Sequence, residues 1–142
     1  IVRFINSSVG LSGWVTFQDL IFSDGHSTTA GIAGGVSLQN AQATFINCVF
    51  QNNRNESFST GGGGVEVAIN STAFFVGCTW TGNSATFYGG GLSVEAQATA
   101  YLHACQFTNN RTNLPNHDPA SAGGAISCGS STPRVNSARA SR

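Results

Sequence analysis

The chain has 142 residues, a formal net charge of zero at pH 7 and only 8 % charged residues. A chain of this length forms one domain at most, and its sparse, balanced charge offers no basic surface for nucleic acid. No apolar run reaches the roughly 20 residues that a membrane-spanning helix requires, so we expect no membrane insertion by this chain.

The first predicted elements are two short strands, residues 1–5 and 15–22, separated by a turn around residues 10–13 that contains glycine and serine. Beyond them a two-part phrase recurs three times. Its first part has a glycine pair followed by a strand-like run, and its second part runs from an apolar residue through a cysteine and an aromatic residue to asparagine. The three copies read AGGVSL with FINCVFQNN, GGGVEV with FVGCTWTGN, and GGGLSV with LHACQFTNN.

The spacing of the copies indicates a coil of regular length. Leu20, Cys48, Cys78 and Cys105 occupy the same position of successive copies, at intervals of 28, 30 and 27 residues. The apolar residue after the glycine pair recurs at intervals of 29, 27 and 34 residues, ending at Ile126. Both markers advance together, which is typical of a solenoid in which each repeat makes one turn.

The residue types and their alternation favour strands over helices in every repeat. Val36 and Leu38 alternate with Ser37 and Gln39, which predicts one buried face and one solvent face. With about three short strands per repeat, this pattern predicts an all-β fold, a parallel β-helix. Equivalent residues of successive coils then stack about 4.8 Å apart.

We predict about four coils of 27–34 residues followed by a partial coil. The expected repeats are residues 1–30, 31–60, 61–87 and 88–121, with a partial repeat at 122–128 and a linker or disordered tail at 129–142. Insertions at residues 54–60 and 111–122 are expected to bulge outward at one corner of the coil.

Stacking of the repeats predicts three ladders in the second half of the phrase. Two are apolar and form the core, and the third lies between them at a bend where left-handed backbone is expected. The first apolar ladder is Phe17, Phe45, Phe75 and Leu102; the second is Phe22, Phe50, Trp80 and Phe107; the bend is Asp19, Asn47, Gly77 and Ala104.

Two of these phrases also suggest a family. The Gly-Gly-x-hydrophobic phrase at residues 123–126 and the Phe-x-x-Asn phrases at residues 50–53 and 107–110 resemble the repeats of the polymorphic outer membrane proteins of chlamydiae. More broadly, residues 15–128 resemble the pectin-lyase-like, right-handed parallel β-helix superfamily. The resemblance implies a right-handed coil used for adhesion, surface display or scaffolding, although the superfamily also contains polysaccharide lyases and hydrolases.

Hydrolysis of a polysaccharide requires carboxylates about 5–9 Å apart. Glu66 and Glu95 lie on adjacent coils, and both are expected to face outward, two positions out of register. The histidines His26, His103 and His117 are too far apart in the chain to form a local metal motif. We therefore predict no catalytic, metal or cofactor-binding residue.

The cysteines form a further predicted ladder. Cys48, Cys78 and Cys105 are expected to point inward at a spacing within disulfide range, so they are either buried thiols or contain one bridged pair. Cys128 aligns with Val67 and Val94 on another strand and lies outside this ladder.

Four Asn-x-Ser/Thr sequons, at Asn6, Asn55, Asn70 and Asn110, indicate secretion. We expect Asn55, Asn70 and Asn110 to be exposed at loops or turns and one or more of them to be glycosylated. The outward column that contains His103 also contains Ile46 and Val76, so we expect another chain or a glycan to cover this face. The candidates for sugar-stacking aromatic residues are Trp14, Phe58, Phe87 and Tyr88.

These features together predict a non-enzymatic structural or adhesive solenoid segment of a secreted or cell-surface glycoprotein. We expect it to contact other protein chains through the ends or the lateral face of the β-helix, because an open β-helix has unpaired strand edges at each end. Glycans are a further expected partner, and nucleic acid is not. The alternative is a protein that binds or degrades polysaccharide, or an inactive remnant of one.

Overall fold

The computed structural model describes residues 2–5, 13–58, 61–113, 123–129 and 134–138 of the chain. All helical or strand elements assigned in these residues are β-strands; none is a helix. The strands form four parallel sheets, here called sheets A to D. None of the described residues belongs to a helix long and apolar enough to cross a membrane. The predicted all-β parallel solenoid is therefore confirmed.

Sheets A and B each contain five strands. Sheet A consists of β1 (Val2–Ile5), β5 (Val36–Gln39), β9 (Val65–Val67), β13 (Leu92–Val94) and β17 (Ile126–Cys128). Sheet B consists of β2 (Trp14–Gln18), β6 (Gln42–Ile46), β10 (Thr72–Val76), β14 (Thr99–His103) and β18 (Arg134–Ala138).

Sheets C and D each contain four shorter strands. Sheet C consists of β3 (Ile21–Ser23), β7 (Val49–Gln51), β11 (Thr79–Thr81) and β15 (Gln106–Thr108). Sheet D consists of β4 (His26–Ser27), β8 (Arg54–Asn55), β12 (Ser84–Ala85) and β16 (Arg111–Thr112).

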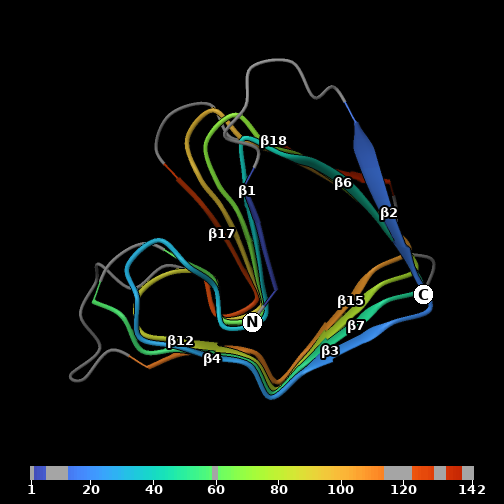
Figure 1. The fold of residues 1–142 in the computed structure, drawn as a ribbon. Helices are drawn as coiled ribbons and strands as arrows, with labels where there is room; N and C mark the ends of the chain where they lie inside the picture. Colours follow the sequence, from blue (N-terminus) through green and yellow to red (C-terminus); the bar gives the residue numbers. More distant parts are fainter. Residues whose placement is uncertain (1, 6–12, 59–60, 114–122, 130–133, 139–142) are drawn as a thin grey trace.

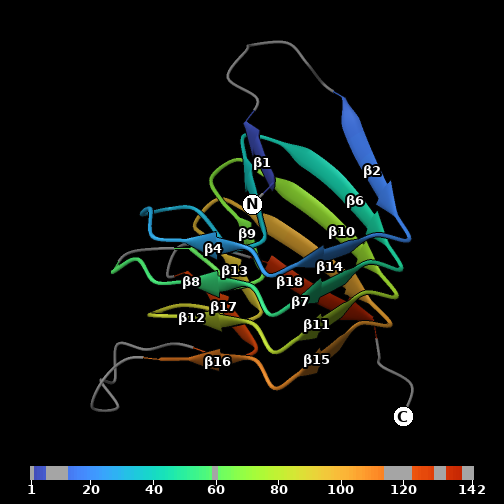
Figure 2. The same cartoon turned by 60° about the horizontal axis from the view of Figure 1, so that its bottom comes forward.

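Each coil passes through sheets A, B, C and D in turn, so β1–β4 form the first coil, β13–β16 the fourth, and β17 and β18 begin a fifth. Figure 1 looks along the axis of the solenoid, where the strands of each sheet lie over one another. Figure 2 shows the same coils stacked, from β2 of the first coil to β15 and β16 of the fourth.

The two predicted apolar ladders form the core between sheets A, B and C. The strand registers pair Phe17 with Phe45 and Phe22 with Phe50, as predicted. Rings stack along both ladders, with centroids 5.0 Å apart for Phe45 and Phe75 and 4.9 Å apart for Phe50 and Trp80. These rings supply most of the large buried side chains, and the interlocked ladders keep adjacent coils in register.

The predicted bend between sheets B and C is also confirmed. Asp19, Asn47, Gly77 and Ala104 all have left-handed backbone, with φ between 50° and 63°. A second left-handed bend, between sheets C and D, was not predicted and consists of Asp24, Asn52, Gly82 and Asn109. Aspartate, asparagine and glycine tolerate this conformation best, and they occupy seven of these eight positions.

The glycine pairs allow close packing between coils, and in the last copy Gly123 also has left-handed backbone, with a φ of 57°. Gly63 and Gly64 do not have positive φ, but a Cβ atom at Gly63 would overlap the carbonyl oxygen of Gly90 in the next coil. Any larger residue would therefore push neighbouring coils apart at the start of sheet A.

Sheet D corrects the prediction of about three strands per coil. Arg54–Asn55 and Arg111–Thr112 were expected to begin outward-bulging insertions, but they form β8 and β16 and pair in register with β12. The equivalent positions His26, Arg54, Ser84 and Arg111 do not keep one residue type from coil to coil, so this column was not recognised as part of the repeat.

The predicted tail also requires correction. Residues 134–138, inside the segment expected to be a linker or tail, form β18 and pair with β14 from Thr99↔Arg134 to His103↔Ala138. This strand has neither the aromatic residue nor the cysteine of the repeated phrase. An edge strand is held by backbone hydrogen bonds to one neighbour, so it does not require that phrase.

The outer face of sheet A is buried, although the alternation of residues predicted that it faces solvent. The segments that leave sheet D turn back over this face before they enter sheet A (Figure 1). Ala33 N donates a hydrogen bond to Ser37 Oγ at 2.6 Å, and Gln39 Nε2 donates to Gly31 O at 3.1 Å. Ser37, Glu66 and Ser93 are consequently buried.

A ladder of buried asparagines joins the coils at the start of sheet D. Asn83 Nδ2 donates to Phe50 O at 2.8 Å and to Asn110 Oδ1 at 2.9 Å. Asn83 Oδ1 accepts hydrogen bonds from the backbone N and the Nδ2 of Asn53, each at 3.0 Å. The amide therefore satisfies backbone groups at a bend where the regular sheet pattern is interrupted.

We expect Asn83→Ala to lower the free energy of unfolding by roughly 3 kcal/mol, because it leaves buried groups of Phe50 and Asn53 without their partner. Urea denaturation followed by circular dichroism measures this change. The control Gln106→Ala lies on exposed β15 and should change stability by less than about 0.5 kcal/mol. Equal effects of the two substitutions would contradict a structural role for the ladder.

Candidate functional site

The structure buries one of the two carboxylates that the sequence placed on a solvent-facing side. Glu66 is fully buried beneath the segments that cover sheet A, and its Oε2 accepts a hydrogen bond from Ser37 Oγ at 3.0 Å. Glu95 lies just after β13 and is half-buried. The expectation that both face outward is wrong for Glu66, because the covering segments could not be foreseen from strand alternation.

The remaining described acids are dispersed over the surface. Asp19 and Asp24 lie at the two left-handed bends, and Glu56 follows β8. His26 and His103 lie on sheets D and B, while His117 and Asp118 fall outside the described residues. Within the described part of the chain, no group of three or more His, Cys, Asp or Glu residues could hold a metal ion.

A shallow hollow of about 500 Å³ lies over the outer side of sheet D. It is lined by Thr28, Arg54, Asn55, Glu56, Phe58, Thr86 and Asn113. The pairing of sheet D assembles this lining from four coils, since Thr28, Glu56, Thr86 and Asn113 each come directly after the sheet D strand of their coil. Sequence reasoning missed the hollow because it missed sheet D.

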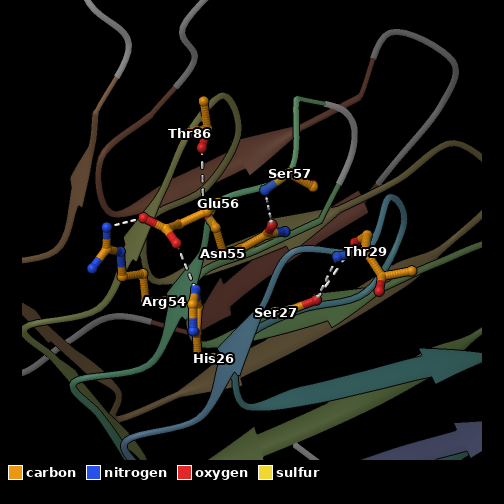
Figure 3. Close-up of polar contacts among 8 residues, drawn as sticks. All are labelled: His26, Ser27, Thr29, Arg54, Asn55, Glu56, Ser57 and Thr86. Carbon is orange, nitrogen blue, oxygen red and sulfur yellow. Dashed lines mark hydrogen bonds and ion pairs between the residues drawn. The ribbon is translucent and has the colours of Figure 1, made fainter.

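Glu56 is the carboxylate of this hollow, and Figure 3 shows it between Arg54 and His26. Its Oε2 lies 2.6 Å from His26 Nε2, and its Oε1 accepts a hydrogen bond from Arg54 Nη2. All three side chains are substantially exposed, so these contacts contribute little to stability. They hold the carboxylate in one orientation beside the hollow.

The deeper wall of the hollow is a buried hydrogen-bond network. Asn55 accepts a hydrogen bond from Ser57 N at 2.8 Å through its Oδ1 and donates to Ile32 O at 3.1 Å through its Nδ2. Thr86 Oγ1 donates to Asn55 O at 3.3 Å (Figure 3). The wall is therefore fixed, and the rim carries Phe58, whose ring is 81 % exposed.

The chemistry of the hollow suits recognition more than hydrolysis. It offers a carboxylate, a guanidinium, two amides and two hydroxyls beside an exposed aromatic ring, which together match the hydroxyls and the apolar face of a sugar. Among the described residues that line it there is a single carboxylate, and both oxygens of that carboxylate already have cationic or imidazole partners.

The outer face of sheet B presents a second group of exposed side chains. The predicted column of His103 with Ile46 and Val76 is confirmed by the strand registers. Phe74 and Tyr101, which were not among the predicted exposed aromatic residues, stack in register with ring centroids 4.4 Å apart. Because the two rings cover each other, this face offers an apolar contact surface rather than open ring faces.

Of the aromatic residues expected to be exposed, Trp14 and Phe58 are exposed, whereas Phe87 and Tyr88 are half-buried. Trp14 reaches Phe74 across the second coil, with ring centroids 5.3 Å apart. Strand alternation could have identified Phe74, since a residue next to the inward Phe75 must face outward.

The sequons differ in accessibility. Asn55 is buried and its amide is hydrogen-bonded, so the expectation that it is exposed is wrong; the reason is that sheet D directs it inward. Asn110 is half-buried, and its Nδ2 donates to Trp80 O at 2.9 Å within the asparagine ladder. Asn70 is exposed at a turn, and Asn6 falls outside the described residues.

The cysteine ladder has the predicted positions. Cys48 and Cys78 are buried, Cys105 is half-buried, and all are free thiols in this structure. Cys128 pairs in register with Val94 in sheet A, as predicted, and is exposed. Burial of part of its side chain raises the pKa of Cys128.

Comparison with known proteins agrees with this architecture. The family model described as "Right handed beta helix region" matches residues 4–141 of the chain. A search of curated proteins and a search of solved structures each gave no match. The family includes both enzymes and non-enzymes. Since the match covers nearly the whole chain, including β18, the chain belongs to the right-handed β-helix family.

Proposed function

We propose that the chain is a non-catalytic structural segment of an extracellular assembly, in which another protein chain stacks on its first coil. The observation that carries the proposal is the exposure of inward-facing apolar residues in the first described coil. Val15 and Leu20 are each 43 % exposed, whereas their equivalents in the second coil, Ala43 and Cys48, are buried.

The aromatic ladders support the same proposal. Phe17 stacks on Phe45 and Phe22 stacks on Phe50, with centroids 5.0 and 5.2 Å apart. Both first-coil rings are only half-buried, whereas Phe45 and Phe50 are fully buried between neighbours on both sides. A further coil would bury the remaining faces of Phe17 and Phe22 and extend both ladders.

The backbone at this end offers matching hydrogen-bond groups. Strands β2, β3 and β4 are the edge strands of sheets B, C and D, each paired on one side only. An edge of this kind accepts an added strand through main-chain hydrogen bonds. An extracellular location would fit the exposed sequon at Asn70, which we propose as a glycosylation site.

We expect Val15→Lys to weaken association through this end, because the equivalent positions Ala43 and Ala73 are buried in the inner coils and burial of a lysine ammonium between stacked coils is unfavourable. Sedimentation velocity over a range of concentrations should show association of the unaltered chain and a shift toward monomer for the variant. Phe58→Lys is the control, since Phe58 is also exposed but lies beside sheet D. A chain that stays monomeric at high concentration would contradict the proposal.

A second candidate function is binding of a neutral polysaccharide at the hollow over sheet D. The observation that favours it is the exposed ring of Phe58 beside the carboxylate of Glu56 and the side chains of Thr86 and Asn113. An aromatic face with fixed polar groups around it is a common arrangement in ligand sites.

If the hollow binds polysaccharide, Phe58→Ala should reduce binding to the preferred insoluble glycan at least about tenfold, because the apolar contact is lost. Co-sedimentation with cellulose, chitin and β-1,3-glucan measures this loss. Phe74→Ala removes an exposed aromatic residue from sheet B and should leave the binding unchanged. Failure of the unaltered chain to bind any of the three glycans would exclude this function for neutral polymers of these kinds.

A further inference from the structure

The cysteine ladder is a feature that neither proposed function uses. Cys48, Cys78 and Cys105 come directly after the bend between sheets B and C, one position before residues that pair in register in sheet C. Each thiol points into the coil and donates to a carbonyl of the preceding coil, with Sγ–O distances of 3.5, 3.4 and 3.5 Å to Phe17, Phe45 and Phe75. The three sulfur atoms therefore form a column along the core.

The spacing of this column allows either of two disulfides, one between Cys48 and Cys78 and the other between Cys78 and Cys105, but not both at once. Gln106 N donates to Cys78 O at 2.9 Å, and Thr79 N donates to Cys48 O at 2.9 Å, so adjacent cysteines lie on directly paired backbone. Paired parallel strands lie about 4.8 Å apart, within the Cα separation of 4.4–6.8 Å found in disulfides.

Access by an oxidant distinguishes the two pairs. Cys48 and Cys78 are fully buried between neighbouring coils. Cys105 belongs to the fourth coil, where β15 is the edge strand of sheet C, and it is only half-buried. A small molecule in solution therefore reaches Cys105 first, and the only ladder thiol next to Cys105 is Cys78.

Electrostatics within the pair supports the same order of events. The neighbouring Cys78 thiol lowers the pKa of Cys105 to about 7, and backbone hydrogen bonds act in the same direction. The same contact with Cys105, together with burial, raises the pKa of Cys78. Cys105 is thus the thiol that supplies a thiolate near neutral pH, and the thiolate is the reactive form.

We propose that Cys105 and Cys78 form a disulfide between the third and fourth coils when the folded chain meets a small-molecule disulfide such as oxidised glutathione. The Cys105 thiolate attacks one sulfur of the oxidant, forms a mixed disulfide and releases one glutathione thiolate. Cys78 then loses its proton and attacks the Cys105 sulfur, which releases the second glutathione thiolate. Two protein thiols are oxidised and one glutathione disulfide is reduced to two thiols.

This bridge would close a loop of 27 residues, from Cys78 to Cys105, across the edge of the solenoid. A closed loop restricts the unfolded chain and so favours the folded state. Among the described residues, the fourth coil has a neighbour on one side only in sheets C and D, so it benefits most from a covalent tie to the third coil. This inference does not depend on the proposed assembly or on glycan binding.

Tryptic peptide mapping tests the proposal. The folded, reduced chain carrying Cys128→Ser, which removes the exposed thiol, is incubated with oxidised glutathione and then digested. Cleavage after Arg54 and Arg111 leaves Cys78 and Cys105 together in residues 55–111, whereas Cys48 lies in residues 4–54. We expect peptide 55–111 to lose two hydrogens, and the melting temperature to rise by roughly 5–10 °C.

Two further variants complete the test in the same background. Cys48→Ser, altered at an equally buried thiol, should form the bridge as before. Cys78→Ser should instead retain one glutathione on Cys105, because the resolving thiol is absent. A cross-link between peptides 4–54 and 55–111, or a peptide 55–111 that remains fully reduced in the folded chain, would overturn the proposal. Both readouts come from the chain with Cys78 intact, so they hold even if Cys78→Ser fails to fold.

Discussion

Parallel, in-register hydrogen bonding between successive coils is the constraint on which the rest of the structure depends. Each residue lies directly over its equivalent in the next coil. An inward-pointing side chain must therefore pack against the equivalent side chains of the neighbouring coils. Aromatic rings meet this condition by stacking, and asparagine meets it by donating and accepting along the same column. Glycine meets it at the corner, where the coils approach too closely for a Cβ atom.

The same constraint explains how much of the fold the sequence predicted. A column in which a side-chain type recurs is visible in the sequence as a repeated residue at regular spacing. For this reason the registers of Phe45 with Phe75 and Phe50 with Trp80 were predicted correctly. The bend through Asn47 and Gly77 was predicted for the same reason. The asparagines at 53, 83 and 110 also left a signature, but their hydrogen bonds depend on a turn geometry that spacing alone does not reveal.

The features that were missed are those held by backbone pairing or by contacts between segments that do not repeat. Sheet D places His26, Arg54, Ser84 and Arg111 in one column, and the residue type in this column changes between coils, unlike that of the aromatic ladders. The hollow and the Glu56 ion pairs depend on sheet D, so the sequence could not predict them. The burial of Glu66 depends on segments that vary in length and fold back over sheet A.

The repeated side chains therefore form the interior, and any functional surface must lie on the outer faces or at the ends of the coils. The hollow beside Phe58 and the apolar face around Phe74 are surfaces of this kind, and the uncovered first coil is the most pronounced of them. At that end the half-buried rings of Phe17 and Phe22 coincide with unpaired edges of three sheets. An added coil would satisfy the aromatic ladders and the backbone together.

Hydrogen exchange measured on the chain in its native surroundings shows whether another chain stacks on the first coil. We expect amides of β2, β3 and β4 that exchange quickly in the isolated chain to become protected in the native assembly, to a degree similar to those of β6 and β7. Equally fast exchange of these first-coil amides in both states would contradict this expectation.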